Sequence, residues 1–220
     1  MEQQDPDIQA PEQQAPGITA IIPMKKLEDS KTRLAPDLSP ERRANLVLGM
    51  LSRVLAAMQG SSIDRVWVVG GDDRVQNLTR NMGGDWFYEM GRNLNDTLGK
   101  AFDLAFERGS SALYIPGDLP FLKASDLHSL VTATRRQNNI TLAPARRDGG
   151  TNGLLVPLGI PFHPALGDRS FTKHLALAAE LGISAAMCYS LGLGFDLDIP
   201  EDLKTYQHME PGFLDRLAPE

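Results

Sequence analysis

Short apolar segments alternate with amphipathic segments along most of the chain, and this alternation is what most restricts the fold. Residues 18–22 and 65–69 have the length and the β-branched content of buried strands. Between them, Ser39 and Pro40 form a helix start, and apolar residues then recur at helical spacing over 46–58. Repeated strand–helix units predict an α/β fold, a mostly parallel twisted sheet with helices on both faces.

Length and composition limit the number of domains and the classes of partner. With 220 residues and 42% hydrophobic content, the sequence predicts one domain over 17–220, after a disordered tail, 1–16, rich in Gln, Pro and acids. The sequence has no apolar run of about 18 residues, so we expect no membrane span. Its first 16 residues lack the basic start and apolar core of a secretory signal, so we expect none there. The single cysteine, Cys188, fits a reducing cytoplasm, where we expect the protein. A net charge of -6 argues against a nucleic-acid surface.

Two apolar segments end in carboxylates. Residues 112–115 form a strand-sized run that stops at Gly117-Asp118-Leu119-Pro120, which places Asp118 at the carboxyl end of a strand, where open α/β sheets bind ligands. Asp118 is a candidate metal ligand, although a turn or capping role is an alternative. Asp196 and Asp198 are two residues apart in an extended stretch and share a face, so a cation between them would relieve their repulsion.

A basic loop follows the first predicted strand. Lys25, Lys26, Lys31 and Arg33 come directly after its carboxyl end. Their charges suit a polyphosphate, with Arg33 binding oxygens in bidentate fashion, while a solvated charged loop is the alternative. No dinucleotide glycine fingerprint and no Walker motif is present.

Three further polar segments are candidates for substrate contacts. The Gly-rich loop at 146–153 has backbone donors and arginines that suit a small anion, or it is a plain hairpin connection. Gly167 and Ser170 precede a predicted helix, where an anion site and a capping role are both consistent with the sequence. Asn95 either caps a helix, as Asp96 also could, or contacts a base edge.

Taken together, a basic loop and acids at strand ends suit a magnesium–nucleoside triphosphate complex and hence nucleotidyl transfer. The ordered motifs are Ile21-Ile22-Pro23-Met24-Lys25, Lys31-Thr32-Arg33-Leu34-Ala35, Gly117-Asp118-Leu119-Pro120, Thr151-Asn152, Gly167-x-x-Ser170 and Asp196-x-Asp198. This set resembles the guanylyltransferases of deazaflavin coenzyme F-420 biosynthesis, which activate 2-phospholactate or phosphoenolpyruvate with GTP. Their fold is similar to that of the nucleotide-diphosphosugar transferases, which is Rossmann-like.

The resemblance implies roles for individual residues. It implies a Mg2+ site made of carboxylates: Asp118, Asp196 and Asp198. It implies a triphosphate site made of basic side chains: Lys25, Lys31 and Arg33. It implies a pocket for the three-carbon acid: Thr151, Asn152, Gly167 and Ser170. Catalysis is expected from Asp118, Asp198, Lys25 and Lys31, and guanine contact from Asn95. Several relatives have threonine at the position of Asn152, a difference that bears on which acid is accepted.

The expected reaction is attack by a phosphate oxygen of the acid on the α-phosphorus of GTP, with release of pyrophosphate and transfer of the product to a downstream enzyme. The acid itself, among 2-phospholactate, phosphoenolpyruvate and 3-phosphoglycerate, is not determined by the sequence, and a homodimer is left open. Two alternatives remain: a nucleotidyltransferase that uses CTP with a sugar or molybdopterin substrate, and a non-catalytic nucleotide-binding protein.

Overall fold

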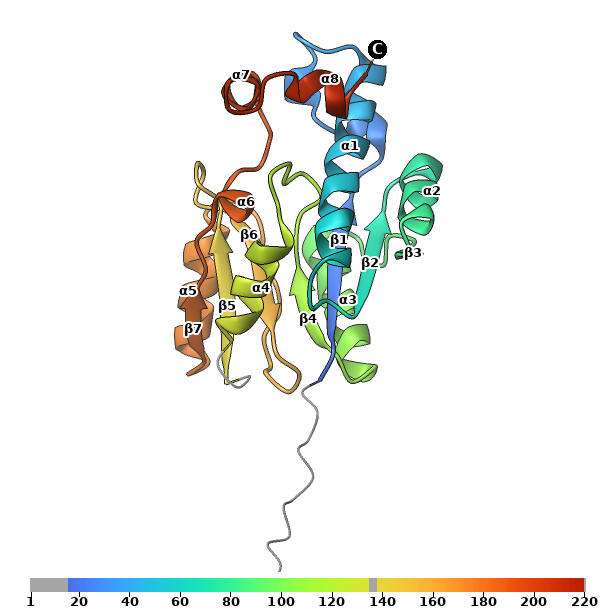
Figure 1. Cartoon of the computed structure of the whole chain (residues 1–220). Coiled ribbons are helices and arrows are strands. Elements are labelled where there is room, and N and C mark those ends of the chain that lie inside the picture. Colours follow the sequence, from blue (N-terminus) through green and yellow to red (C-terminus); the bar gives the residue numbers. More distant parts are fainter. Residues whose placement is uncertain (1–15, 135–137, 220) are drawn as a thin grey trace, which may run out of the picture.

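The computed structural model describes residues 16–134 and 138–219, and its strands there form one seven-stranded sheet in the order β3-β2-β1-β4-β6-β5-β7 (Figure 1). The strands are β1 Ile18–Met24, β2 Arg65–Gly70, β3 Asp85–Phe87, β4 Ser111–Tyr114, β5 Asn139–Pro144, β6 Thr151–Val156 and β7 Ser184–Met187. Only β6 runs antiparallel to its neighbours, β4 and β5, whereas every other pairing is parallel. The predicted mostly parallel α/β sheet is therefore confirmed.

The helices lie between the strands and after the last of them. The α-helices are α1 Pro40–Gln59, α2 Asp73–Asn81, α3 Leu94–Glu107, α4 Ala124–Thr132, α5 Ser170–Glu180, α6 Leu191–Gly194, α7 Pro200–Met209 and α8 Phe213–Leu217. Two short 3-10 helices, η1 Leu27–Asp29 and η2 Thr32–Leu34, lie in the basic loop. No helix in the described ranges is long and apolar enough to cross a membrane.

Two hydrophobic cores cover the two faces of the sheet. Successive side chains of a strand point to opposite faces, so Ile22 enters the core built with α1, α4, α7 and α8, while Ile21 enters the core built with α3 and α5. Both side chains are fully buried. Strands buried on both faces explain the near-continuous apolar runs of the sequence. Cys188 is buried in the first core, as expected of a small apolar residue.

Several local predictions about the ends of elements were wrong. Thr151 and Asn152 are not in a loop but are buried in β6, because β5 and β6 form a hairpin that extends to Thr151 past a bulge at Ala143/Pro144. Asn93, not Asn95 or Asp96, caps α3, its side chain accepting from the backbone N–H of Asp96 at 3.0 Å. The expected tail, 1–16, lies outside the described residues except for its last position.

Candidate active site

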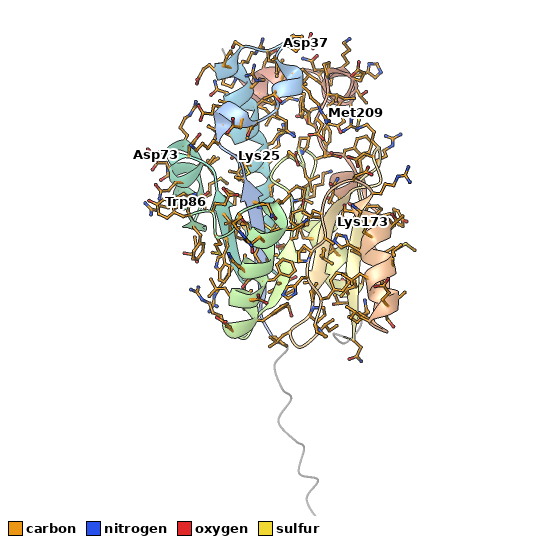
Figure 2. All side chains as sticks on the ribbon, turned by 180° about the vertical axis from the view of Figure 1, so that it is seen from behind. Lys25, Asp37, Asp73, Trp86, Lys173 and Met209 are labelled. Atoms are coloured by element: carbon orange, nitrogen blue, oxygen red, sulfur yellow. The ribbon has the colours of Figure 1, made fainter. Side chains whose placement is uncertain are left out.

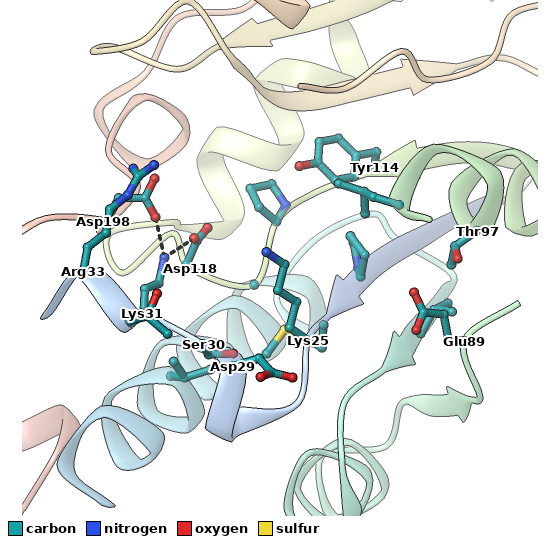
Figure 3. Close-up of a pocket in the computed structure, with 18 residues that line it drawn as sticks. Lys25, Asp29, Ser30, Lys31, Arg33, Glu89, Thr97, Tyr114, Asp118 and Asp198 are labelled. Carbon is teal, nitrogen blue, oxygen red and sulfur yellow. Dashed lines mark hydrogen bonds and ion pairs between the residues drawn. The ribbon is translucent and has the colours of Figure 1, made fainter. Parts of the chain in front are cut away.

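A cavity of about 520 Å³ opens at the carboxyl ends of β1, β2 and β4. Figure 2 labels Lys25 just beyond the end of β1, and Figure 3 shows this side chain in the middle of the cavity. One wall is the basic loop, with Lys25, Lys31 and Arg33, and another is the loop after β4, with Asp118. The sheet edge therefore brings the predicted basic loop and the predicted acid to one cavity.

Lys31 lies between two of the predicted metal ligands. Its Nζ is 2.5 Å from Oδ2 of Asp118 and 2.8 Å from Oδ1 of Asp198, and its side chain is only 9% exposed (Figure 3). Burial alone would lower the pKa of Lys31, but the two carboxylates outweigh it and raise the pKa above its ordinary value. The backbone of Lys31 is left-handed, with φ of 50°, a strained conformation for a residue with a side chain. Lys31 thus joins an acid of the loop after β4 to an acid of the segment before α7.

A second group of carboxylates adjoins this ion pair. Oxygens of Asp148, Asp196 and Asp198 all lie within 4.8 Å of one another. Burial, followed by the charges of Asp118 and Asp198, raises the pKa of Asp196 to about 6. Burial also acts to raise the pKa of Asp198, but Lys31 and Arg147 more than reverse it, so that pKa is lowered. The Arg147 Nη2 is 3.3 Å from Oδ2 of Asp198.

These carboxylates fit a metal ion. One ammonium group, that of Lys31, already contacts an oxygen of Asp118 and an oxygen of Asp198. The other oxygen of Asp118, Oδ1, is buried and has no hydrogen-bond partner in the described parts of the chain, an arrangement that is costly unless a ligand satisfies it. Hard divalent cations prefer such oxygen ligands.

Residues of α7 hold the acidic segment in place. Oδ2 of Asp202 accepts from the backbone N–H groups of Asp198 and Ile199, at 2.8 and 3.0 Å. The Tyr206 hydroxyl donates to the Asp196 carbonyl at 2.5 Å. This combination of helix cap and tyrosine fixes the direction of both acids.

The predicted acid-binding residues are also clustered. Ala165 N–H donates to Nε2 of His174 at 2.8 Å, and burial lowers the pKa of His174 to about 4, so the ring is neutral with its proton on Nδ1. That proton is donated to Oγ1 of Thr151, 2.9 Å away, which also accepts from the Ser170 hydroxyl at 3.3 Å. Thr151 therefore keeps its own hydrogen free for another partner. Ser170 does not cap α5; it is the first residue of that helix and is buried.

Asn152 and Asn95 have different surroundings. The Asn152 side-chain amide donates to Oδ1 of Asp196 at 3.3 Å, so it contacts the carboxylates. Asn95 donates to the Leu166 carbonyl at 3.1 Å and accepts from the Leu166 N–H at 2.8 Å. Both polar atoms of the Asn95 amide are thus used to bind the loop before Gly167. The guanine contact of Asn95 stays a prediction, and this geometry does not favour it.

Residues 18–208 match the family model described as "Guanylyl transferase CofC like". The chain belongs to this guanylyl transferase family. A phosphoenolpyruvate guanylyltransferase of Rubrobacter xylanophilus is 35% identical over 84% of this chain and 91% of its own length. A 3-phospho-D-glycerate guanylyltransferase of Phenylobacterium zucineum is 35% identical over 83% and 86%. A 2-phospho-L-lactate guanylyltransferase of Methanothermobacter thermautotrophicus is 34% identical over 84% and 81%.

Solved structures share the fold of this CofC-like guanylyl transferase at low sequence identity. A protein from Desulfovibrio desulfuricans G20, assigned to the nucleotide-diphospho-sugar transferases, aligns with a TM-score of 0.73 and 16% identity over 92% of this chain and 91% of its own. A nucleotidyl transferase from Methanothermobacter aligns with a TM-score of 0.61 and 17% identity over 90% and 98%. The nucleotide-diphosphosugar-transferase-like fold is therefore confirmed.

Sequence reasoning missed several residues of the site in this guanylyl transferase. Asp148 joins the carboxylates although its segment was expected to bind an anion, and Arg147 pairs with Asp198. Tyr114 and Glu89 line the cavity, yet neither belongs to a motif. The Asp148-Gly149-Gly150 turn was the available signal, because a turn aspartate beside a hairpin can face the same sheet edge as other acids.

Proposed function

We propose that this chain transfers the guanylyl group of GTP to the phosphate of a phosphorylated three-carbon acid and releases pyrophosphate. The observation that carries the proposal is the family match over 18–208, joined to a cavity in which Lys25, Lys31 and Arg33 face Asp118 and Asp198. Cations on one wall suit a triphosphate, and carboxylates on the other suit its counterion. We assign this activity to a single domain, 17–220.

The chemistry needs positioning and charge neutralisation more than proton transfer. The attacking phosphate oxygen is already anionic, so no general base is required; its bond to the α-phosphorus forms as the bond to pyrophosphate breaks. Lys25 and Arg33 would neutralise the triphosphate oxygens, and Lys31 would do so once released from the acids. Asp118, Asp196 and Asp198 would hold Mg2+, which supplies charge neutralisation when bound.

The acid is proposed to bind beside these carboxylates. The Ser170 hydroxyl donates to Thr151, and the neighbouring residue of the strand, Asn152, contacts Asp196. The relatives named above act on phosphoenolpyruvate, 3-phospho-D-glycerate or 2-phospho-L-lactate, so we propose one of these three acids as the substrate. The guanylylated product would pass to a downstream transferase.

One assay tests the proposal. Purified protein with Mg2+ and GTP is given each acid in turn, and pyrophosphate release is measured, with CTP in place of GTP as a parallel arm. We expect pyrophosphate release from GTP with at least one acid, and a loss of about 100-fold or more in Asp118→Asn, the scale of removing an electrostatic contributor. Turnover of CTP but not GTP, or full activity of Asp118→Asn, would contradict the assignment.

A further inference from the structure

The cavity has two chemically different ends. Figure 3 shows Lys31, Asp118 and Asp198 together at one end, Lys25 in the middle, and Glu89 with Thr97 at the other. The first end suits phosphates and their counterion. A nucleotide lying along the cavity would therefore place its base at the end formed by Glu89 and Thr97.

A carboxylate at this second end requires an explanation. Glu89 is exposed, lines the cavity, and has no hydrogen-bond or ion-pair partner among residues 16–134 and 138–219. An unpaired negative charge in a cavity that must admit a polyanion raises the free energy of the bound state by repulsion. The charge is useful there only if it faces hydrogen-bond donors of the ligand.

The remaining lining of this end suits a flat heterocycle. Val69 at the end of β2 and Leu94 at the start of α3 supply apolar surface, and Leu94 is 43% exposed. Thr97 is buried, and its hydroxyl has no partner in the described part of the chain. Apolar walls with a few polar groups are typical of a small-molecule subsite.

We propose that Glu89 recognises the guanine base, its carboxylate accepting hydrogen bonds from the N1–H and 2-amino groups. The inference rests on the proposed guanylyl transfer and assigns base specificity within the same cavity. An ionised carboxylate only accepts, with two oxygens side by side. Guanine alone among the common bases has two adjacent donors on its Watson–Crick edge; adenine and cytosine place an acceptor beside their amino group, and uracil has a single N–H between two carbonyl groups.

The test compares GTP with ITP, which lacks the 2-amino group. Dissociation constants of both magnesium complexes are measured by calorimetry, together with kcat/KM for pyrophosphate release, in the parent, in Glu89→Gln and in Asp29→Asn. Asp29→Asn is the matched control, because it also removes one negative charge, but from the basic-loop wall of the same cavity. Glu89 is exposed and unpaired, so Glu89→Gln is expected to fold normally, as circular dichroism would verify.

We expect the parent to bind GTP more tightly than ITP by on the order of 10-fold or more, because a group built to accept a hydrogen bond discriminates against an analogue that lacks the donor. In Glu89→Gln the ratio of the ITP and GTP dissociation constants should be close to one, because the glutamine amide places an N–H donor opposite one of the N–H donors of guanine. In Asp29→Asn the ratio should stay at the parent value. A parent that does not distinguish the nucleotides, an unchanged ratio in Glu89→Gln, or an equal loss in Asp29→Asn overturns the inference. If no acid supports turnover, the proposed function fails, and the binding ratios still decide the role of Glu89.

Discussion

Replacing Lys31 by methionine removes the positive charge that joins Asp118 to Asp198. Its Nζ is 2.5 Å from one acid and 2.8 Å from the other, and the side chain is 9% exposed. Methionine keeps much of the apolar stem but leaves both carboxylates without this cation. In metal-free protein we expect the free energy of unfolding to fall, because two like charges then face each other.

The size of the loss follows from burial. Removing one partner of a fully buried ion pair costs about 3–5 kcal/mol, but the side chains of Asp118 and Asp198 are 26% and 31% exposed, so solvent screening reduces the value to about 2 kcal/mol. Mg2+ should recover the loss. A ligand at 100 times its dissociation constant stabilises a protein by about 2.7 kcal/mol, and in Lys31→Met no ammonium group competes for the site.

Urea denaturation with and without Mg2+ measures both effects. The stabilisation by Mg2+ should be larger in Lys31→Met than in the parent, and the metal-free variant should be the less stable of the two proteins. Lys25→Met is the control, since Lys25 lines the same cavity and has no ion pair in the described part of the chain. If Lys25→Met and Lys31→Met behave alike, or if Mg2+ stabilises the parent more, the idea that Lys31 occupies the place of a cation is refuted.

Three further predictions concern the acids and the acid-binding group. The pKa of Asp196 is raised to about 6, so in metal-free protein the protonation of this carboxyl should stabilise the folded state increasingly as pH falls from 7 toward 4. The affinity for Mg2+, measured by thermal shift, should weaken as pH falls below about 6, and it should weaken less in Asp196→Asn. Asp202→Ala removes the acceptor of the Asp198 N–H, so stability should fall by about 1 kcal/mol and kcat by about 10-fold, whereas the exposed Glu201→Ala on the same helix should change neither. Ser170→Ala should raise KM for the acid but not for GTP in steady-state kinetics, and a rise confined to GTP would contradict its assignment to the acid pocket.

The sheet and most of the carboxylates at the site were predictable because they depend on local pattern. Residues 18–22 are apolar on both faces, which predicts a central parallel strand, and β1 is indeed buried between two helical layers. The acid after residues 112–115 was expected at a carboxyl edge because parallel strands end at the same edge. The contact of Asp118 with the same lysine as Asp198 agrees with that reasoning. Whether these acids bind Mg2+ stays a prediction.

Other parts of the site depend on pairing and packing that no local pattern records. Thr151 and Asn152 follow two glycines and have turn-like neighbours, but the β5–β6 hairpin buries them. The position of Asn95 in the sequence is consistent with a helix cap or a base contact. Its side-chain amide instead forms hydrogen bonds with the backbone of Leu166, a residue 71 positions away. Asp148 lies near Asp196 and Asp198 because β5 runs in the same direction as β4, which places the turn between β5 and β6 at the carboxyl edge. Such contacts arise from topology and not from spacing.

The balance of charge at this edge connects the fold to the proposed chemistry. Asp148, Asp196 and Asp198 lie together in a protein of net charge -6, and their mutual repulsion is relieved by Lys31 and Arg147, which both pair with Asp198. Lys31 also lines the cavity, so a triphosphate bound there would compete with the acids for this lysine. If the proposed function holds, a magnesium–triphosphate complex would exchange partners at this site without adding much net charge: the anion would pair with Lys31, and the acids that Lys31 leaves would hold the metal. An exchange of this kind favours joint entry of metal and nucleotide, because either one alone would leave charges unpaired.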